Sequence, residues 1–124
     1  MEIVFSTQAP AAVGPFSQAI KSNSMLYLSG QLPLDSETMK FSASNVTGQA
    51  EQIFRNISSV IAEAGCEKES IVKTTVFLSD MNNFAEFNAA YSEFFGEHKP
   101  ARSCVEVARL PLDALVEIEL IAEL

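Results

Sequence analysis

Apolar residues recur along this chain at two spacings, and each spacing predicts a different kind of element. Over residues 46–64 they recur every three or four positions, which places them on one stripe of a helix with 3.6 residues per turn. Asn45 precedes this stretch and Gly65 follows it, and both residue types are favoured at those ends of a helix. A second helix is predicted over residues 83–95, where aromatic side chains supply most of the apolar stripe.

Six other stretches are rich in apolar and β-branched residues and predict strands. They are residues 2–6, 16–21, 25–31, 70–79, 102–109 and 114–123. The second and third should form a hairpin, and so should the last two, which are joined by a turn at residues 110–113. Strands and two helices in this order predict an α+β fold, a two-layer sandwich with both helices on one face of a mixed β-sheet.

Two helices can cover only one face of such a sheet, so the opposite face needs another cover. We expect the alternating apolar residues of 116–124 to supply an apolar surface on that face, and a homo-oligomer to bury it. The length of 124 residues fits a single domain, residues 1–124.

Charge narrows the range of partners. The chain has 8 Lys and Arg against 16 Asp and Glu, a formal net charge of −8, so we expect no binding to nucleic acid or to an anionic membrane. No apolar run approaches the roughly 20 residues of a membrane span. The N-terminus carries Glu2 and no basic segment, unlike a signal peptide, so a cytoplasmic location is the default expectation.

Residue counts exclude several kinds of site. His98 is the only histidine, which excludes a metal site built from several histidines, and we expect no metal. Cys66 and Cys104 form no CxxC pair, so a zinc or redox motif is unsupported. Two widely spaced thiols fit a reducing compartment, with one disulfide as the alternative. No two glycines are spaced for a phosphate-binding loop.

A few polar residues stand out by position. Arg102 and Cys104 share one face of their predicted strand, and pairing with the last strand would bring a carboxylate beside them. The arginine, the thiol and the carboxylate together would form a small anion-binding site. The alternative is an exposed arginine and a solvated row of carboxylates, since surface ion pairs are common and weak. Asn88 lies on the apolar stripe of its helix, as a structural amide or as a group facing a ligand. Ser29 before Gly30 forms a turn or contacts a ligand.

Five motifs in order resemble the RidA (YjgF) family of reactive-intermediate deaminases. The most specific is PARSCVEVARLP, residues 100–111. The others are APAAVGPFSQA at 9–19, LSGQLP at 28–33, the strand and helix of 71–95, and VEIELIA at 116–122. The resemblance therefore covers nearly the whole chain.

The resemblance implies a fold similar to chorismate mutase of the bacillus type, and a homotrimer with three clefts between subunits. It also implies an activity: hydrolysis of 2-imino acids, such as 2-iminopropanoate and 2-iminobutanoate, to 2-oxo acids and ammonia. These imines arise from 2-aminoacrylate-type enamines. No cofactor is implied, and the expected ligand is a small 2-imino or 2-oxo carboxylate at the subunit interface.

The family's motifs also imply roles for individual residues. Arg102 takes the position of the arginine that binds the substrate carboxylate, a role that suits the planar guanidinium. Glu117 takes the position of the acid that orients and activates water. The remaining matches line the cleft, with Cys104 expected to pack rather than to form a covalent bond. These residues are Phe16, Ser29, Gly30, Asn88 and Cys104.

Two departures from the family pattern keep other functions open. The motif commonly reads GPYSQ, but Phe16 here lacks the phenolic hydroxyl, and the loop at residues 97–99 is short. Either change can alter substrate range or rate. One alternative is a trimer that binds small carboxylates without useful turnover. Another is a translation-inhibiting ribonuclease-type relative, against which the net charge of −8 and the single histidine argue.

Overall fold

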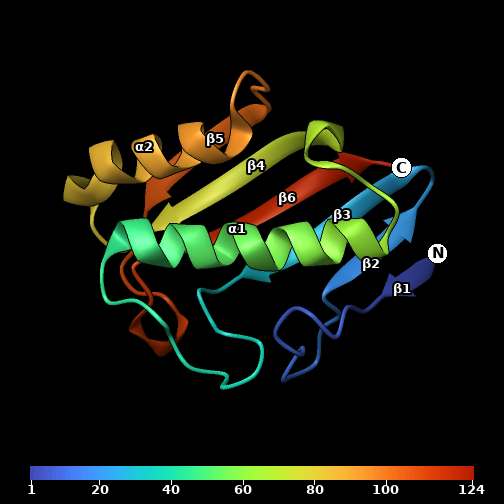
Figure 1. The fold of residues 1–124 in the computed structure, drawn as a ribbon, viewed down its shortest axis with the longest axis horizontal. Coiled ribbons are helices and arrows are strands. Elements are labelled where there is room, and N and C mark those ends of the chain that lie inside the picture. The colour runs from blue at the N-terminus through green and yellow to red at the C-terminus, as the bar shows by residue number, and fades with distance from the viewer.

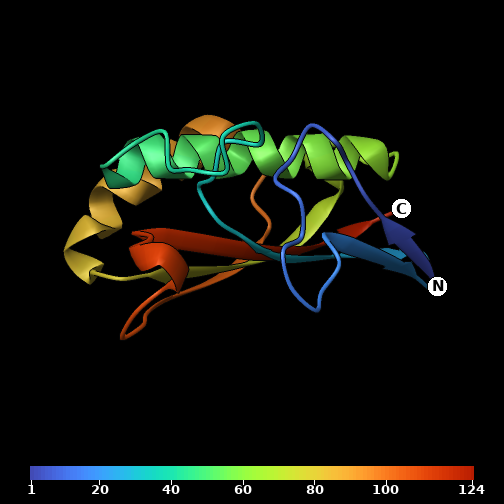
Figure 2. The ribbon, with the colours of Figure 1, turned by 90° about the horizontal axis from the view of Figure 1, so that it is seen from below.

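The computed structural model describes all residues 1–124 and has two layers. One layer is a six-stranded mixed sheet in the order β1-β2-β3-β6-β4-β5, with only β4 and β5 parallel. Figure 2 shows both helices on one side of this sheet, which confirms the predicted sandwich. The strands are β1 (Glu2–Val4), β2 (Ala19–Ser22), β3 (Met25–Gln31), β4 (Ile71–Leu78), β5 (Ala101–Glu106) and β6 (Val116–Glu123). The helices are α1 (Val46–Glu63) and α2 (Phe84–Phe95), and one-turn 3₁₀ segments lie at Lys68–Ser70, Met81–Asn83 and Pro111–Asp113 (Figure 1).

Helix α1 begins and ends where the sequence predicts. The Asn45 side chain accepts a hydrogen bond from the Gly48 amide at 2.7 Å, which satisfies one of the free amides of the first turn. Gly65 follows the helix with a φ of 83°, a left-handed conformation that suits glycine. Ile53 and Val60 on the apolar stripe are fully buried against the sheet.

Helix α2 is held by aromatic packing. Phe87, Tyr91 and Phe95 lie on its buried stripe. Phe54 of α1 stacks on Phe94 with ring centroids 4.4 Å apart, and it meets Tyr91 edge-on at 6.1 Å. These contacts join the two helices into one layer and fix the height of α2 above β4 and β5.

The predicted hairpin of the last two strands is wrong. β5 lies parallel to β4 at the sheet edge, and β6 inserts between β3 and β4, antiparallel to both (Figure 1). The physical reason is that β4, α2 and β5 form a β-α-β crossover, which places its second strand parallel beside the first. The chain then passes through the Pro111–Asp113 turn and returns as a central strand.

The apolar residues of β6 that were predicted to drive assembly lie on the face covered by the helices and not on the open face of the sheet. The apolar alternation of β6 points toward the helices, with Val116, Ile118 and Ala122 fully buried in the core. The physical reason is that a central strand under two helices needs its apolar side there. The open face of β6 carries Glu117, Glu119, Ile121 and Glu123 instead. Assembly through this face therefore stays a prediction, with a more polar surface than the sequence pattern indicated.

Both cysteines are free thiols. No three His, Cys, Asp or Glu side chains are grouped to hold a metal ion. Neither helix has the length and apolar character needed to cross a membrane.

Candidate active site

The carboxylate half of the candidate site lies where β3 bends beside β6. Glu117 projects from the open face of β6, partly buried, next to Gly30. The register of β3 against β6 shifts between Leu28 and Gln31, and this irregularity brings the Gly30 backbone under the carboxylate. A β-carbon at Gly30 would overlap Glu117 Oε1 and lie 2.9 Å from its Cδ, so this close approach requires glycine.

Hydrogen bonds hold the neighbouring Ser29 and the loop that carries Phe16. The Ser29 hydroxyl donates to the Ser17 carbonyl at 2.6 Å, and its amide donates to the Gln18 carbonyl at 3.0 Å. The buried Gln18 amide in turn accepts from the Ser6 amide at 2.7 Å and donates to the Pro10 carbonyl at 2.8 Å. These bonds tie the loop before β2 to the edge of β3, so that the Phe16 ring, Ser29 and Glu117 line one cavity.

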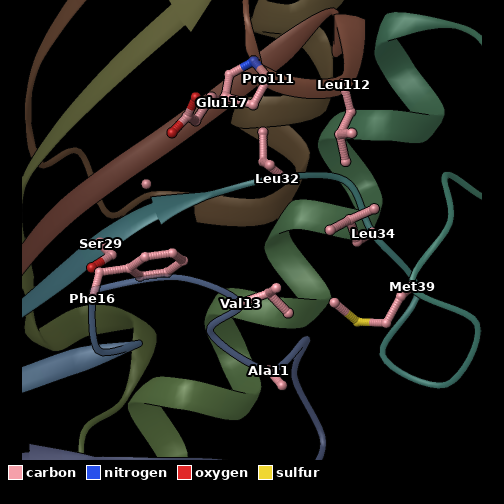
Figure 3. Close-up of a pocket in the computed structure, with 11 residues that line it drawn as sticks. Ala11, Val13, Phe16, Ser29, Leu32, Leu34, Met39, Pro111, Leu112 and Glu117 are labelled. Atoms are coloured by element: carbon pink, nitrogen blue, oxygen red, sulfur yellow. The ribbon is translucent and has the colours of Figure 1, made fainter.

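This cavity has a volume of about 710 Å³ and two unlike ends. Figure 3 shows Ser29 and Glu117 toward one side and aliphatic side chains toward the other. Its lining residues are Ala11, Val13, Phe16, Ser29, Gly30, Leu32, Leu34, Met39, Pro111, Leu112 and Glu117. Four of the predicted site residues therefore line the same cavity: Phe16, Ser29, Gly30 and Glu117.

The environment of Glu117 changes its acidity. Burial raises the pKa of the Glu117 carboxyl above its ordinary value, and the neighbouring Glu119 adds to the rise. A carboxylate with a raised pKa is a better proton acceptor at the pH where it is ionised. Glu117 is thus suited to take a proton from water.

The arginine half lies between β5 and α2. Arg102 Nη1 donates to Asn88 Oδ1 at 2.8 Å, and the guanidinium lies 4.8 Å from the centre of the Tyr91 ring and 5.7 Å from that of Phe84. The Tyr91 hydroxyl is fixed in turn by a buried hydrogen bond of 2.8 Å with Thr74. Aromatic faces attract a cation and hold the guanidinium plane.

Arg102 makes no ion pair in the chain. It lines a second cavity of about 410 Å³ with Asn88, His98 and Lys99. A held guanidinium with unused N–H groups and no carboxylate partner is a ready site for a small anion. The sequence predicted Arg102 and Asn88 as site residues, whereas Tyr91 was only one of the aromatic residues on the predicted helix stripe of residues 83–95.

The thiol and the imidazole near Arg102 are poorly placed for nucleophilic chemistry. Burial raises the pKa of the Cys104 thiol, an effect that the nearby Arg102 charge only partly opposes. A thiol with a raised pKa is a weak nucleophile, because the thiolate is the reactive form. The His98 Nε2 lies 2.7 Å from the Ile71 carbonyl, a bond that ties the end of α2 to the sheet.

The two halves do not meet within one chain, contrary to the pairing that the sequence predicted. Arg102 faces the helix layer, whereas Glu117 projects from the open face. β4 separates their strands, and along β4 the partner of Arg102 is Thr74 and that of Glu117 is Phe77. Strand spacings put the two backbones about 10 Å apart across the sheet and about 10 Å apart along it.

Comparison with known proteins agrees with the fold and identifies the family. The family model described as "Endoribonuclease L-PSP" matches residues 6–124. A RutC family protein of Synechocystis is 54% identical over 126 residues, covering 100% of this chain and 97% of that protein. The chain therefore belongs to the L-PSP endoribonuclease family, also known as the YjgF/RidA family.

Other relatives have more specific names. The 2-iminobutanoate/2-iminopropanoate deaminase of Salmonella typhimurium is 48% identical over 122 residues, covering 96% of this chain and 94% of that protein. The crystal structure of Escherichia coli TdcF with bound serine superposes with a TM-score of 0.95 at 41% identity, covering 100% of this chain and 99% of that chain.

Relatives in plants and yeast are named for other compartments. The Arabidopsis thaliana relative is named as chloroplastic, and the Saccharomyces cerevisiae relative as mitochondrial. A cytoplasmic location for this chain stays an expectation from its sequence.

Proposed function

We propose that this protein hydrolyses reactive 2-imino acids to 2-oxo acids and ammonia. The observation that carries the proposal is the unpaired Arg102, whose guanidinium is held by Asn88 and Tyr91 and left free for a carboxylate. The Salmonella relative named for this reaction supports the substrate class. The bound serine in the E. coli structure supports binding of a small carboxylate by this fold.

The proposed reaction needs only two protein side chains, Arg102 and Glu117. The two guanidinium prongs of Arg102 hold the substrate carboxylate. Glu117 orients a water and accepts its proton as the oxygen bonds to the imine carbon, while the imine nitrogen takes up a proton. The carbinolamine then expels ammonia as the carbon–nitrogen bond breaks and the carbonyl forms. Imine plus water therefore gives 2-oxo acid plus ammonia, with no oxidant or cofactor.

Such a site needs two copies of the chain. Because Arg102 and Glu117 lie on opposite faces of one sheet, we infer that Arg102 of one subunit meets Glu117 of the next, in a homotrimer with a site at each interface. A head-to-tail arrangement of this kind closes into a ring when the rotation between copies is one third of a turn. Each site then joins the edge strand of one subunit to the open face of another.

A trapping assay tests the activity. An amino-acid oxidase acting on L-alanine supplies 2-iminopropanoate, and semicarbazide traps the imine that survives. The protein should lower the trapped imine and raise pyruvate in proportion to its concentration. Trapped imine that stays at the protein-free level would contradict the proposed hydrolysis.

Mixing two impaired variants tests the shared site. Arg102→Lys keeps Glu117 and Glu117→Gln keeps Arg102, so a mixed ring recreates an intact pair at one of its three interfaces. After equal mixing and subunit exchange, about a quarter of all sites should be intact if three copies combine at random in a ring. Activity should rise from the background of either variant toward that fraction. If mass measurements prove subunit exchange but activity does not return, then either both residues belong to a site within one subunit or neither residue belongs to the site.

Phe16 favours a second candidate function, a carboxylate-binding protein without useful turnover. Phe16 is 52% exposed, lines the cavity and brings no hydroxyl to it. This candidate expects calorimetric binding of 2-oxobutanoate that Arg102→Lys weakens, together with no effect on imine lifetime. Restoring a hydroxyl with Phe16→Tyr should then create turnover.

A further inference from the structure

We propose that the buried hydroxyl pair of Thr74 and Tyr91 positions Arg102, and that it orders the guanidinium for a substrate carboxylate before any substrate binds. This role rests on the proposed function, since it takes Arg102 as the group that binds the carboxylate. Thr74 lies fully buried under the helix layer and acts only through its neighbours, so it is a positioning residue. Every contact involved lies within one chain, on the helix side of the sheet.

Two direct contacts connect the threonine to the arginine. Thr74 Oγ1 and the Tyr91 hydroxyl oxygen are 2.8 Å apart, and both are buried. The guanidinium carbon of Arg102 lies 4.8 Å from the centre of the Tyr91 ring. Thr74 is also the partner of Arg102 where β4 pairs with β5. The arginine therefore leaves the sheet beside the threonine, and its guanidinium lies against the ring that the threonine holds.

Both hydroxyls lie among apolar side chains. On the same side of β4, Val76 and Leu78 are fully buried. On the buried stripe of α2, the neighbours of Tyr91 are Phe87 and Phe95. A valine and a phenylalanine would fill the space of the two hydroxyl-bearing residues. Replacing both partners of a buried hydrogen bond by apolar groups of the same shape is nearly neutral for stability, so the polar pair indicates a use other than stability.

The hydrogen bond fixes the ring relative to the sheet. Phe54 meets the Tyr91 ring edge-on at 6.1 Å, and the tilted Phe95 ring lies 4.6 Å away. Such apolar packing is not directional, whereas a hydrogen bond has a preferred length and angle. The bond to Thr74 therefore sets where the ring face lies beside the guanidinium. Burial raises the pKa of the Tyr91 phenol above its ordinary value of 10, so the phenol stays neutral at neutral pH.

Arg102 needs this support because it is only half-buried. One hydrogen bond, from Nη1 to Asn88 Oδ1 at 2.8 Å, leaves the guanidinium free to turn about that contact. The Tyr91 face restricts the turn, and the Phe84 ring at 5.7 Å adds to the restriction. Ordering a long side chain during binding costs affinity, so an arginine that is already ordered binds a carboxylate more tightly.

Removing the Thr74 hydroxyl tests the role. Thr74→Val keeps the shape and leaves the buried Tyr91 hydroxyl without its partner. The dissociation constant of 2-oxobutanoate, measured by calorimetry, should rise about 2- to 10-fold, the cost of ordering one side chain on binding. KM for the imine should rise by the same factor with kcat unchanged, because Glu117 is untouched. An unchanged dissociation constant in Thr74→Val would overturn the proposal.

Two further variants are controls for Thr74→Val. Thr74→Ser keeps the hydroxyl and should bind 2-oxobutanoate as the wild type does. Thr47→Val makes the same chemical change on the exposed first turn of α1, and its binding should also equal that of the wild type. Weakened binding in Thr74→Ser to the level of Thr74→Val would mean that the hydroxyl is not the group that matters.

A double variant separates positioning from stability. Thr74→Val combined with Tyr91→Phe leaves no unpaired hydroxyl, so its free energy of unfolding should return close to that of the wild type. Its binding of 2-oxobutanoate should stay weaker, because nothing fixes the ring to β4. Binding that returned to the wild-type value together with stability would show that packing alone orders Arg102, and would refute the role of the hydroxyl pair.

A double-mutant cycle shows whether the effect passes through the arginine. In an Arg102→Lys background no guanidinium plane remains to be oriented, so Thr74→Val should cause little further loss of binding. A further loss as large as that in the wild-type background would mean that Thr74 acts on the fold in general, and would overturn the proposal.

The arginine itself reports its position without a ligand. The ring current of Tyr91 shifts the NMR resonances of the Arg102 side chain, and Thr74→Val should move them toward those of an exposed arginine, whereas Thr47→Val should not. If the wild type neither hydrolyses an imine nor binds a 2-oxo acid, the proposed function fails and these resonances decide the positioning alone. Resonances that stay in place in Thr74→Val would overturn the positioning, whatever the activity.

Discussion

Replacing Arg102 by lysine keeps the positive charge and removes the geometry on which the proposed site depends. In the structure the guanidinium donates to Asn88 at 2.8 Å and lies 4.8 Å from the Tyr91 ring centre, so its plane is fixed. A lysine ammonium is a point charge on a flexible stem and cannot bond a carboxylate through two parallel prongs. The variant therefore isolates the second prong and the orientation from the charge.

The size of the effect follows from these contacts. One charge-assisted hydrogen bond to the substrate is lost, which contributes about 1.5–3 kcal/mol. At about 1.4 kcal/mol for each factor of ten, kcat/KM should fall about 10- to 150-fold. Most of the change should appear in KM if the carboxylate is held equally in the bound substrate and in the transition state.

The fold should tolerate the change, because Arg102 is partly exposed and has no ion pair to lose. We expect the melting temperature to fall by only a few degrees, as is common for about 1 kcal/mol in a domain of this size. Arg55→Lys is the matched control: Arg55 also donates to a side-chain amide, that of Gln52, but from the outer surface of α1. Its kcat/KM should equal that of the wild type. A kcat/KM of Arg102→Lys near that of the wild type would mean that the arginine is structural.

Other predictions separate the remaining roles. Glu117→Gln should lower kcat by about 100-fold or more, as expected for loss of a general base, and Cys104→Ala much less; the reverse order would indicate a covalent thiol adduct, visible by mass spectrometry. Because the pKa of Glu117 is raised in the folded state, its protonated carboxyl stabilises the fold at low pH, and this stabilisation is lost as pH rises above the ordinary value of 4.5. The free energy of unfolding of Glu117→Gln, measured by urea titration, should therefore increase relative to that of the wild type from pH 4 to 7. A constant difference would contradict the raised pKa. Gly30→Ala should displace the Glu117 carboxylate and lower kcat while the chain still folds, which circular dichroism and the trapping assay check together. Light scattering should give three times 13.5 kDa, and a monomer at micromolar concentration would refute the shared site.

Local sequence patterns predicted the helices and strands correctly, but they did not predict which strands pair in the sheet. The stripe of α1 and its two ends are encoded within about one turn of the helix, so the sequence alone predicts them. The partners of β5 and β6 depend on contacts far apart in the chain. The short connection between β5 and β6 fits a hairpin as well as two strands that lie apart in the sheet, and the parallel pairing of β5 with β4 through the α2 crossover decides between them.

Part of the candidate site was predictable from residue chemistry and pattern alone. Arg102 and Asn88 stood out because each is polar within an apolar or alternating pattern. Glu117 is one of a row of carboxylates on its strand, and only the family resemblance distinguished it. Tyr91 did not stand out, since its ring continues the aromatic stripe and only its contact with the guanidinium gives it a second role. Leu34 and Met39 lie in the loop after β3, where no periodicity indicates which side chains point into a cavity.

Placing Arg102 and Glu117 on opposite faces of the sheet has a chemical consequence. Neighbours on one ladder would form an ion pair, which would lower the pKa of the carboxyl and occupy the guanidinium that the substrate needs. With the sheet between them, burial and Glu119 raise the pKa of Glu117, while Arg102 keeps aromatic and amide neighbours and no carboxylate. A second copy can then bring a free guanidinium to a basic carboxylate with the substrate between them. In the proposed assembly the fold therefore prepares both groups separately, and their chemistry begins only where two subunits meet.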